Sequence, residues 1–174
     1  MQINGAKVVA RYADGRLIKG YTFDFQPHRP RFHVFPDAGA VSTPTAVMVR
    51  ELKALFFVRD HDGNAAYTER KRFLAGESSL WSGRVEVTFR DGEVLVGVAD
   101  EPDPEASGLF VTPVDPRSNN LKVYAVRAAT RGIRHLRTEM PVRATRLSGP
   151  DAWPPRLAMP RRLLRWLVAD ARAS

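Results

Sequence analysis

Lys7–Gly20, with the sequence KVVARYADGRLIKG, aligns without a gap with Arg84–Gly97, with the sequence RVEVTFRDGEVLVG. Both stretches contain an Asp-Gly dipeptide and end in glycine, and the same offset aligns Pro27 with Pro104. Asp, Gly and Pro are the residues that turns require, because backbone geometry rather than packing decides what fits there. The sequence therefore predicts one short folded unit that occurs twice in the chain.

Each copy of this unit is predicted to consist of β-strands. Val85, Val87 and Phe89 alternate with polar residues, which is typical of a half-buried strand. The Asp-Gly dipeptides predict tight hairpin turns, because glycine tolerates the positive φ that such turns demand. Three further strands are expected in each copy, at residues 31–35, 46–50 and 52–59, and at residues 108–112, 122–127 and 131–137.

The two copies together predict an all-β fold. Five short strands per copy are too few for a large sandwich, and a bent sheet that closes into a small barrel leaves no edge exposed. We therefore expect two tandem five-stranded small barrels related by a pseudo-two-fold. The predicted parts are residues 1–60 for the first small-barrel repeat, 61–82 for a charged linker, 83–138 for the second repeat, and 139–174 for a proline-rich strap with a helix.

The C-terminal residues predict a basic amphipathic helix. Pro160 suits the first turn of a helix, and the apolar residues after it form one face. Such a helix can dock on the barrels, bind a partner protein or lie on an anionic membrane, and docking is favoured while membrane contact is not. The residues expected to make partner or membrane contacts are Arg161, Arg162, Arg165 and Trp166.

Composition narrows the class of protein. The chain has 27 Lys and Arg against 19 Asp and Glu, a formal net charge of +8. This charge fits either a nucleic-acid partner or a genome rich in GC codons, and the sequence leaves both open. Zero cysteines exclude disulfides and thiolate metal sites. With no secretory signal and no apolar run of about 18 residues, a cytoplasmic location is expected.

No catalytic motif occurs in the sequence. It contains no phosphate-binding glycine loop, no zinc-protease helix and no nucleophile elbow. None of the four histidines has a carboxylate pair at a metal-ligand spacing, so no metal and no cofactor are expected. Asp24 and Glu101 occupy equivalent positions, but small barrels rarely supply the pocket that separates the pKa values of two acids. A non-enzymatic protein is therefore favoured.

One predicted loop, at residues 23–33, interleaves aromatic and basic side chains. Such a loop can stack on bases and hold phosphates, or its Phe residues can cap the barrel while its arginines are solvated. The second copy has acidic residues at 100–105 instead, and the opposite charges favour self-association. The candidate residues for nucleic-acid or anion binding are Arg11, Phe25, His28, Arg29, Arg31, Arg70, Lys71 and Arg72.

The Asp-Gly hairpin with a glycine at the end of its second strand resembles the Sm-like and SH3-like small barrels, over residues 7–59 and 84–137. Thr130-Arg131-Gly132-Ile133 partly matches the hydrophobic-Arg-Gly signature of Sm-like proteins, whereas the RNA-binding Asp and Asn of that group have no counterpart. The resemblance implies a barrel fold in both copies.

Gly20–Pro27, Phe32–Pro36 and Glu51–Asp60 are similar to a family of uncharacterised bacterial proteins that carry this unit alone, in tandem or beside signalling modules. Arg127 and Arg131 have the Arg-x-x-x-Arg spacing of PilZ domains, which bind cyclic di-GMP, but the second PilZ motif is absent. The leading hypothesis is a non-enzymatic binding or scaffold module of a bacterial cytoplasmic signalling or assembly system, acting through protein contacts and self-association. The alternatives are nucleic-acid binding through a basic face and cyclic-dinucleotide sensing.

Overall fold

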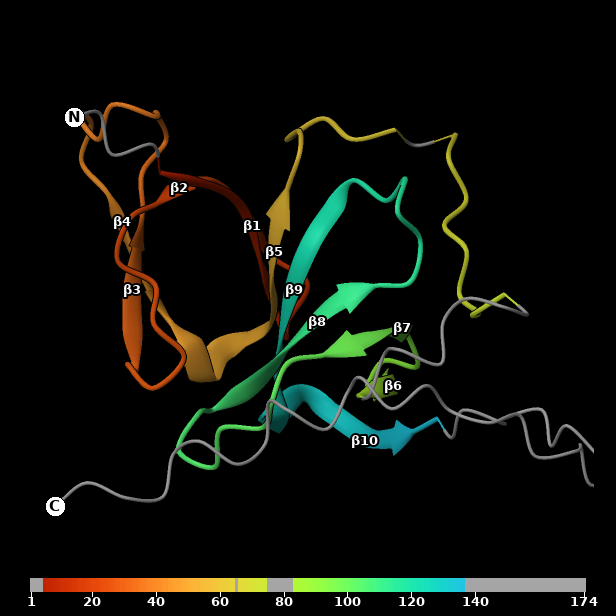
Figure 1. Cartoon of the computed structure of the whole chain (residues 1–174). Coiled ribbons are helices and arrows are strands. Elements are labelled where there is room, and N and C mark those ends of the chain that lie inside the picture. Colours follow the sequence, from red (N-terminus) through yellow and green to blue (C-terminus); the bar gives the residue numbers. More distant parts are fainter. Residues whose placement is uncertain (1–4, 65, 75–82, 137–174) are drawn as a thin grey trace, which may run out of the picture. The chain divides into compact units, whose positions relative to one another are not determined.

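The computed structural model describes residues 5–64, 66–74 and 83–136, which belong to one compact unit of residues 1–140 (Figure 1). These residues form strands and two short 3-10 helices, so the all-β class is confirmed. The elements are β1 (Ala6–Tyr12), β2 (Leu17–Thr22), β3 (Arg31–Val34), β4 (Thr45–Met48), η1 (Val49–Glu51), β5 (Leu52–Val58), β6 (Arg84–Phe89), β7 (Val94–Ala99), β8 (Gly108–Pro113), β9 (Asn120–Val126), η2 (Arg127–Ala129) and β10 (Thr130–His135). The predicted strap and C-terminal helix lie outside the described residues.

The strands pair antiparallel in the same order in both repeats. Eight of them form one sheet in the order β10-β6-β7-β8-β9-β5-β1-β2. β3 and β4 form a separate pair, which an isolated bridge between Tyr21 and Phe35 connects to β2. In each repeat, neighbouring strands therefore follow the order fifth, first, second, third, fourth, counted along the sequence of that repeat.

Both Asp-Gly dipeptides form the predicted hairpin turns. Gly15 and Gly92 have φ values of +96° and +87°, a region that L side chains rarely adopt. In each turn the Asp carboxylate accepts a hydrogen bond from the backbone N–H two residues later, at 3.0 Å in the first turn and 3.1 Å in the second. The two turns thus have the same backbone conformation and the same stabilising contact.

Gly20 lies inside β2 and Gly97 inside β7, two residues before the strand ends rather than at its end as predicted, and each lies against the third strand of its repeat. A Cβ at Gly20 would stand 2.2 Å from the carbonyl oxygen of Phe35, and a Cβ at Gly97 would stand 2.1 Å from that of Thr112. Because a backbone atom cannot move aside as a flexible side chain can, only glycine permits this approach. The shared glycine is a requirement of strand packing.

We expect Gly97→Ala to lower the free energy of unfolding by about 3 kcal/mol, because the added methyl group overpacks against backbone. Gly132→Ala is the matched control, since no atom lies within 4 Å of its Cβ position. Urea denaturation monitored by far-UV circular dichroism measures the free energy of unfolding of both variants. Equal stability of the two variants would contradict this account of Gly97.

The predicted alternation is confirmed, and the two repeats share their cores. The inward residues of β1 and β6 are all buried: Val8, Ala10, Tyr12, Val85, Val87 and Phe89. Tyr124 and Val126 of β9 belong to the apolar cluster of the first repeat, while Ala54 of β5 belongs to that of the second. Neither cluster is therefore made by one repeat alone.

A cluster of aromatic rings lies where the repeats meet. Phe25 packs edge-on against Phe32, Phe57, Phe110 and Tyr124, with ring centroids 5.0 to 6.1 Å apart. Edge-to-face pairs at this distance add to the stabilisation from burial. Phe25 is therefore part of the junction between the repeats.

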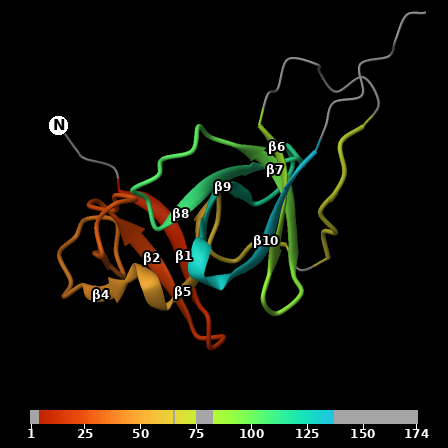
Figure 2. The ribbon, with the colours of Figure 1, turned by 90° about the horizontal axis from the view of Figure 1, so that it is seen from below.

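The predicted barrel closure is wrong. Among the described residues the fourth strand of each repeat does not pair with the fifth; a three-residue 3-10 helix joins them instead. β5 pairs along its outer edge with β9 of the second repeat, and the two strands lie side by side in Figures 1 and 2. A two-fold axis that exchanges the repeats would require β4 to pair with β10, as β5 pairs with β9. These two strands do not pair, so the strand pairing lacks the predicted two-fold relation.

Ion pairs connect β5 to the β6–β7 hairpin. The Lys53 side chain is only 5% exposed, and its ammonium contacts the carboxylates of Asp91 and Glu93. The Arg11 guanidinium contacts Glu93 at 2.8 Å. The hydrogen bond from Lys53 lowers the pKa of Asp91. We call these four residues the Lys53 cluster; it joins the first repeat to the second at the start of β5.

Candidate functional site

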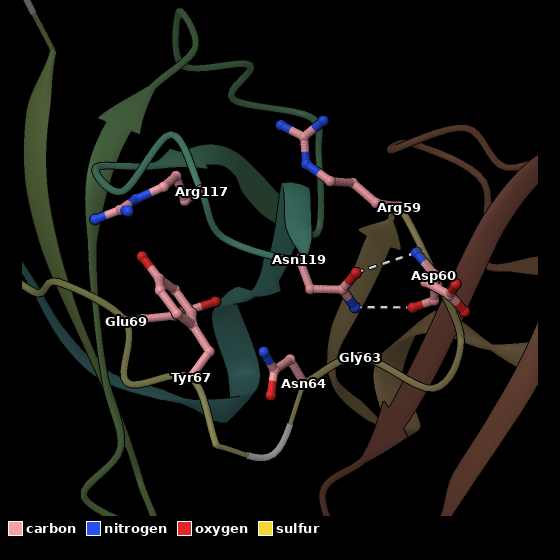
Figure 3. A pocket seen from close by; sticks show the side chains of 8 residues that line it. All are labelled: Arg59, Asp60, Gly63, Asn64, Tyr67, Glu69, Arg117 and Asn119. Atoms are coloured by element: carbon pink, nitrogen blue, oxygen red, sulfur yellow. Dashed lines mark hydrogen bonds between the residues drawn. The ribbon is translucent and has the colours of Figure 1, made fainter.

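A cavity of about 460 Å³ lies at the opposite end of β5, between the segment after this strand and the loop from β8 to β9 (Figure 3). We call it the linker pocket. Its lining residues come from the first repeat, the linker and the second repeat: Arg59, Asp60, Gly63, Asn64, Tyr67, Glu69, Arg117 and Asn119. In Figure 3, Arg117 and Tyr67 lie on one side of the cavity, and Asp60 and Gly63 lie on the other.

One wall of the pocket is held by the side chain of Asn119. Its amide oxygen accepts a hydrogen bond from the backbone N–H of Asp60 at 3.0 Å, and its Nδ2 donates to the Asp60 carbonyl at 2.8 Å. Arg59 Nε donates to the carbonyl of Ser118 at 3.1 Å. These bonds fix the β8–β9 loop to the end of β5, so this wall is preorganised.

The opposite wall is organised around the carboxylate of Asp115. It accepts hydrogen bonds from the backbone N–H of Arg70 at 2.9 Å, from the Tyr67 hydroxyl at 2.6 Å, and from the backbone N–H of Arg117 at 2.9 Å. These bonds lower the pKa of Asp115 to about 2. The hydrogen bond to Asp115 also raises the pKa of Tyr67. Near neutral pH, Asp115 is thus a fixed anion and the Tyr67 ring is held in place.

Glu69 is bound in the same way. Its carboxylate accepts hydrogen bonds from Ser118 Oγ at 2.5 Å and from Asn120 Nδ2 at 3.2 Å. The linker therefore contacts the second repeat through two carboxylates, Asp115 and Glu69, that already have hydrogen-bond donors. Their part in the pocket is to position its walls.

Two of the side chains that line the pocket, Arg117 and Asn64, can donate hydrogen bonds to a ligand. Among the described residues no carboxylate pairs with Arg117, whose guanidinium lies 6.0 Å from the centre of the Tyr67 ring. The Asn64 side-chain oxygen accepts a bond from Ala66 N–H at 3.0 Å, which leaves its NH₂ group available. A cationic fork over an aromatic ring, with an amide donor nearby, suits a ligand that carries a carboxylate or phosphate.

The structure engages three of the predicted binding residues internally. Arg11 pairs with Glu93 at 2.8 Å in the Lys53 cluster, and Phe25 packs in the aromatic cluster. Arg70 Nη2 donates to the carbonyl of Val114 at 2.8 Å. The remaining candidates are exposed: His28, Arg29, Arg31, Lys71 and Arg72.

The predicted binding residues do not form one site. Arg29 and Arg31 flank Pro30, whose carbonyl accepts a hydrogen bond from Val49 of η1, next to the start of β5. Arg70 instead contacts Val114, beside the loop that holds the far end of β5. Candidates on the linker and candidates near η1 therefore lie at opposite ends of this strand. Arg161, Arg162, Arg165 and Trp166 lie outside the described residues.

The basic and acidic loops, at residues 28–31 and 100–105, adjoin within one chain. The carbonyl of Pro27 accepts hydrogen bonds from the backbone and hydroxyl of Ser107, both at 3.3 Å, and from the Tyr124 hydroxyl at 3.0 Å. Opposite charges on the two loops can thus attract each other inside the molecule. Their complementarity does not require a second copy.

Sequence reasoning missed the residues that form the linker pocket. Tyr67 and Glu69 lie in the predicted linker, in which only Arg70, Lys71 and Arg72 are candidate binding residues, and no motif marks Arg117 or Asn119. The only signal is that Asn and Gly cluster after Asp60, which predicts a turn but not its partner. The pocket depends on contacts between residues about fifty positions apart, which local patterns do not encode.

In residues 5–64, 66–74 and 83–136, no group of three or more His, Asp or Glu side chains could hold a metal ion. No helix in this part of the chain is long and apolar enough to cross a bilayer. Both findings concern the described residues alone.

Residues 4–137 match the model of DUF6982, a family of unknown function. The match covers all ten strands and most of the chain, so the chain belongs to this family. Neither a curated protein nor a solved structure matches it.

Proposed function

We propose that this member of the DUF6982 family is a non-enzymatic binding module, built from two repeats of one five-stranded unit, that binds an acidic segment of a protein partner in its linker pocket. The observation that carries the proposal is the Arg117 guanidinium beside the Tyr67 ring, in a cavity of about 460 Å³ whose walls are held by the hydrogen-bonded carboxylates of Asp115 and Glu69. The setting that we propose is a signalling or assembly system of a bacterial cytoplasm.

The ionisation of Asp115, which supports one wall of the pocket, favours binding over proton transfer by this residue. A general acid or base works best when its pKa lies near the working pH. Hydrogen bonds from backbone N–H groups lower the pKa of Asp115 to about 2, so this group stays ionised near neutral pH. Its contacts to Tyr67 and Arg70 instead suit a structural support for the binding groups.

The distribution of charge favours a peptide over a nucleic acid. Arg59 and Arg117 are the two cations that line the pocket, and Asp60 and Glu69 line it too. A nucleic-acid groove neutralises several phosphates along a continuous basic track. A pocket with balanced charge and one arginine over an aromatic ring suits a single carboxylate with its flanking peptide.

The test is a titration of the ¹⁵N-labelled protein with a short peptide of Glu and Ser residues. We expect the largest amide shifts at Gly63, Asn64 and Asn119, and binding that is about tenfold weaker in Arg117→Ala, because a charge-assisted hydrogen bond is lost. Arg134→Ala is the matched control, since Arg134 is an exposed arginine that pairs with Glu86 away from the pocket.

Peptide shifts outside the linker pocket, or equal affinity of both variants, would contradict the proposal. A parallel titration with single-stranded DNA and with cyclic di-GMP tests the alternatives. Binding of DNA that weakens steeply with salt supports a nucleic-acid function. A rise in melting temperature with the cyclic dinucleotide supports a sensor.

A further inference from the structure

Two strand edges are open in the described part of the chain. The eight-stranded sheet begins with β10, which pairs only with β6 there. At the other end β2 connects through the Tyr21–Phe35 bridge to the β3–β4 pair, where β4 pairs only with β3. All the other strands lie between these two edges. An open edge presents unpaired N–H and C=O groups to any strand that fits.

The strand pairing between the two repeats indicates which strand fits such an edge. β5, the fifth strand of the first repeat, pairs with β9, the fourth strand of the second, with Ala54 opposite Ala125 and Leu55 opposite Tyr124. The open edges repeat this combination, because β10 is a fifth strand and β4 is a fourth strand. We propose that β10 of one molecule pairs antiparallel with β4 of a second copy.

The side chains of β10 are consistent with an edge that becomes covered. Every residue of β10 after Thr130 is exposed, whereas the first four residues of β5 are buried. Transfer of the β5–β9 register places Ile133, which is 37% exposed, opposite Ala46, which is also exposed. Pairing would remove both apolar side chains from water.

The backbone N–H groups at alternate positions of β10 face the open edge of the sheet. Leu136 N–H donates to the carbonyl of Arg84 at 2.9 Å, toward β6. Because successive residues of a strand point their N–H groups to opposite sides, the N–H groups of Ile133 and His135 face the open edge. In β5 the equivalent positions, Leu55 and Phe57, face β9 by the same alternation.

Pairing of β10 with β4 is head-to-tail. The two surfaces differ, so each molecule keeps one free edge after it binds, and the contact generates rings or filaments rather than a two-fold dimer. This inference goes beyond the proposed binding of an acidic segment, because it names a second copy of the chain as a further partner. It uses edges apart from the linker pocket, so each proposal can fail without the other.

Two single-cysteine variants of the full chain test the pairing, Ile133→Cys and Ala46→Cys. The chain has no cysteine, so each variant carries one thiol. Directly opposite residues of an antiparallel pair have Cα atoms about 5 Å apart, which a disulfide can bridge. We expect oxidation of the mixture to give a crosslinked heterodimer, while neither variant alone crosslinks to itself.

Crosslinking of Ile133→Cys to itself would overturn the proposal in favour of a two-fold β10–β10 contact. Light scattering of the unmodified chain should give a mass above 19.5 kDa; a monomer at every concentration, without the heterodimer, would also overturn it. Ile133→Lys should abolish assembly, and Leu17→Lys, at an exposed leucine of β2, should leave it intact. The same pair of cysteine variants with Arg117→Ala added to each should still crosslink, which separates this outcome from that of the linker pocket.

Discussion

Replacing both acids of the Lys53 cluster, Asp91→Asn with Glu93→Gln, is expected to lower the melting temperature by about 10 °C. The Lys53 side chain is 5% exposed and its ammonium contacts both carboxylates. The double variant keeps this charge away from water but removes the two groups that compensate it. Removal of one side of a buried ion pair is costly for this reason, whatever the net contribution of the pair itself.

The control for this prediction is the triple variant that adds Lys53→Met. If the acids matter because they compensate Lys53, an apolar side chain of similar length should restore most of the lost stability. Differential scanning calorimetry of the wild type and both variants measures the melting temperatures. A triple variant as unstable as the double variant would show that the acids stabilise the hairpin by another route.

The positions of the strands and turns could be predicted because they follow from local patterns. The alternation from Val85 to Phe89 and the Asp-Gly dipeptides depend on residues that are neighbours in sequence. The absence of barrel closure could not be predicted in this way, because closure depends on which strand edges pair with each other. A signal for the outcome does exist. Leu52–Val58 is almost wholly apolar, as in a strand between two others, whereas Thr130–His135 is mostly polar, as in an edge strand.

The candidate site was less predictable than the fold. An exposed, solvated lysine is the default expectation, yet Lys53 is buried because β9 and the β6–β7 hairpin cover β5. Arg11 and Arg70 were predicted to bind ligands, but each is held by a partner more than forty positions away. The sequence shows which charges exist, and the path of the chain decides which of them remain available to a ligand.

Tyr124→Ala is expected to lower the free energy of unfolding by about 4 kcal/mol, as loss of a large buried aromatic does. Tyr124 is fully buried on β9 of the second repeat, but it packs in the apolar cluster of the first. Its hydroxyl also donates to the carbonyl of Pro27 at 3.0 Å. The cavity would therefore open at the contact between the repeats, so both should unfold in one transition.

Tyr124→Phe separates packing from hydrogen bonding. It keeps the ring but leaves the Pro27 carbonyl with fewer donors, so we expect a loss of about 1 kcal/mol. Urea denaturation monitored by circular dichroism and by amide hydrogen exchange in each repeat measures both variants. If Tyr124→Ala unfolded the first repeat while the second stayed protected, the repeats would be independent domains. A single transition instead means that β9 completes the apolar cluster of the first repeat, and that the two repeats unfold together because β5 pairs with β9.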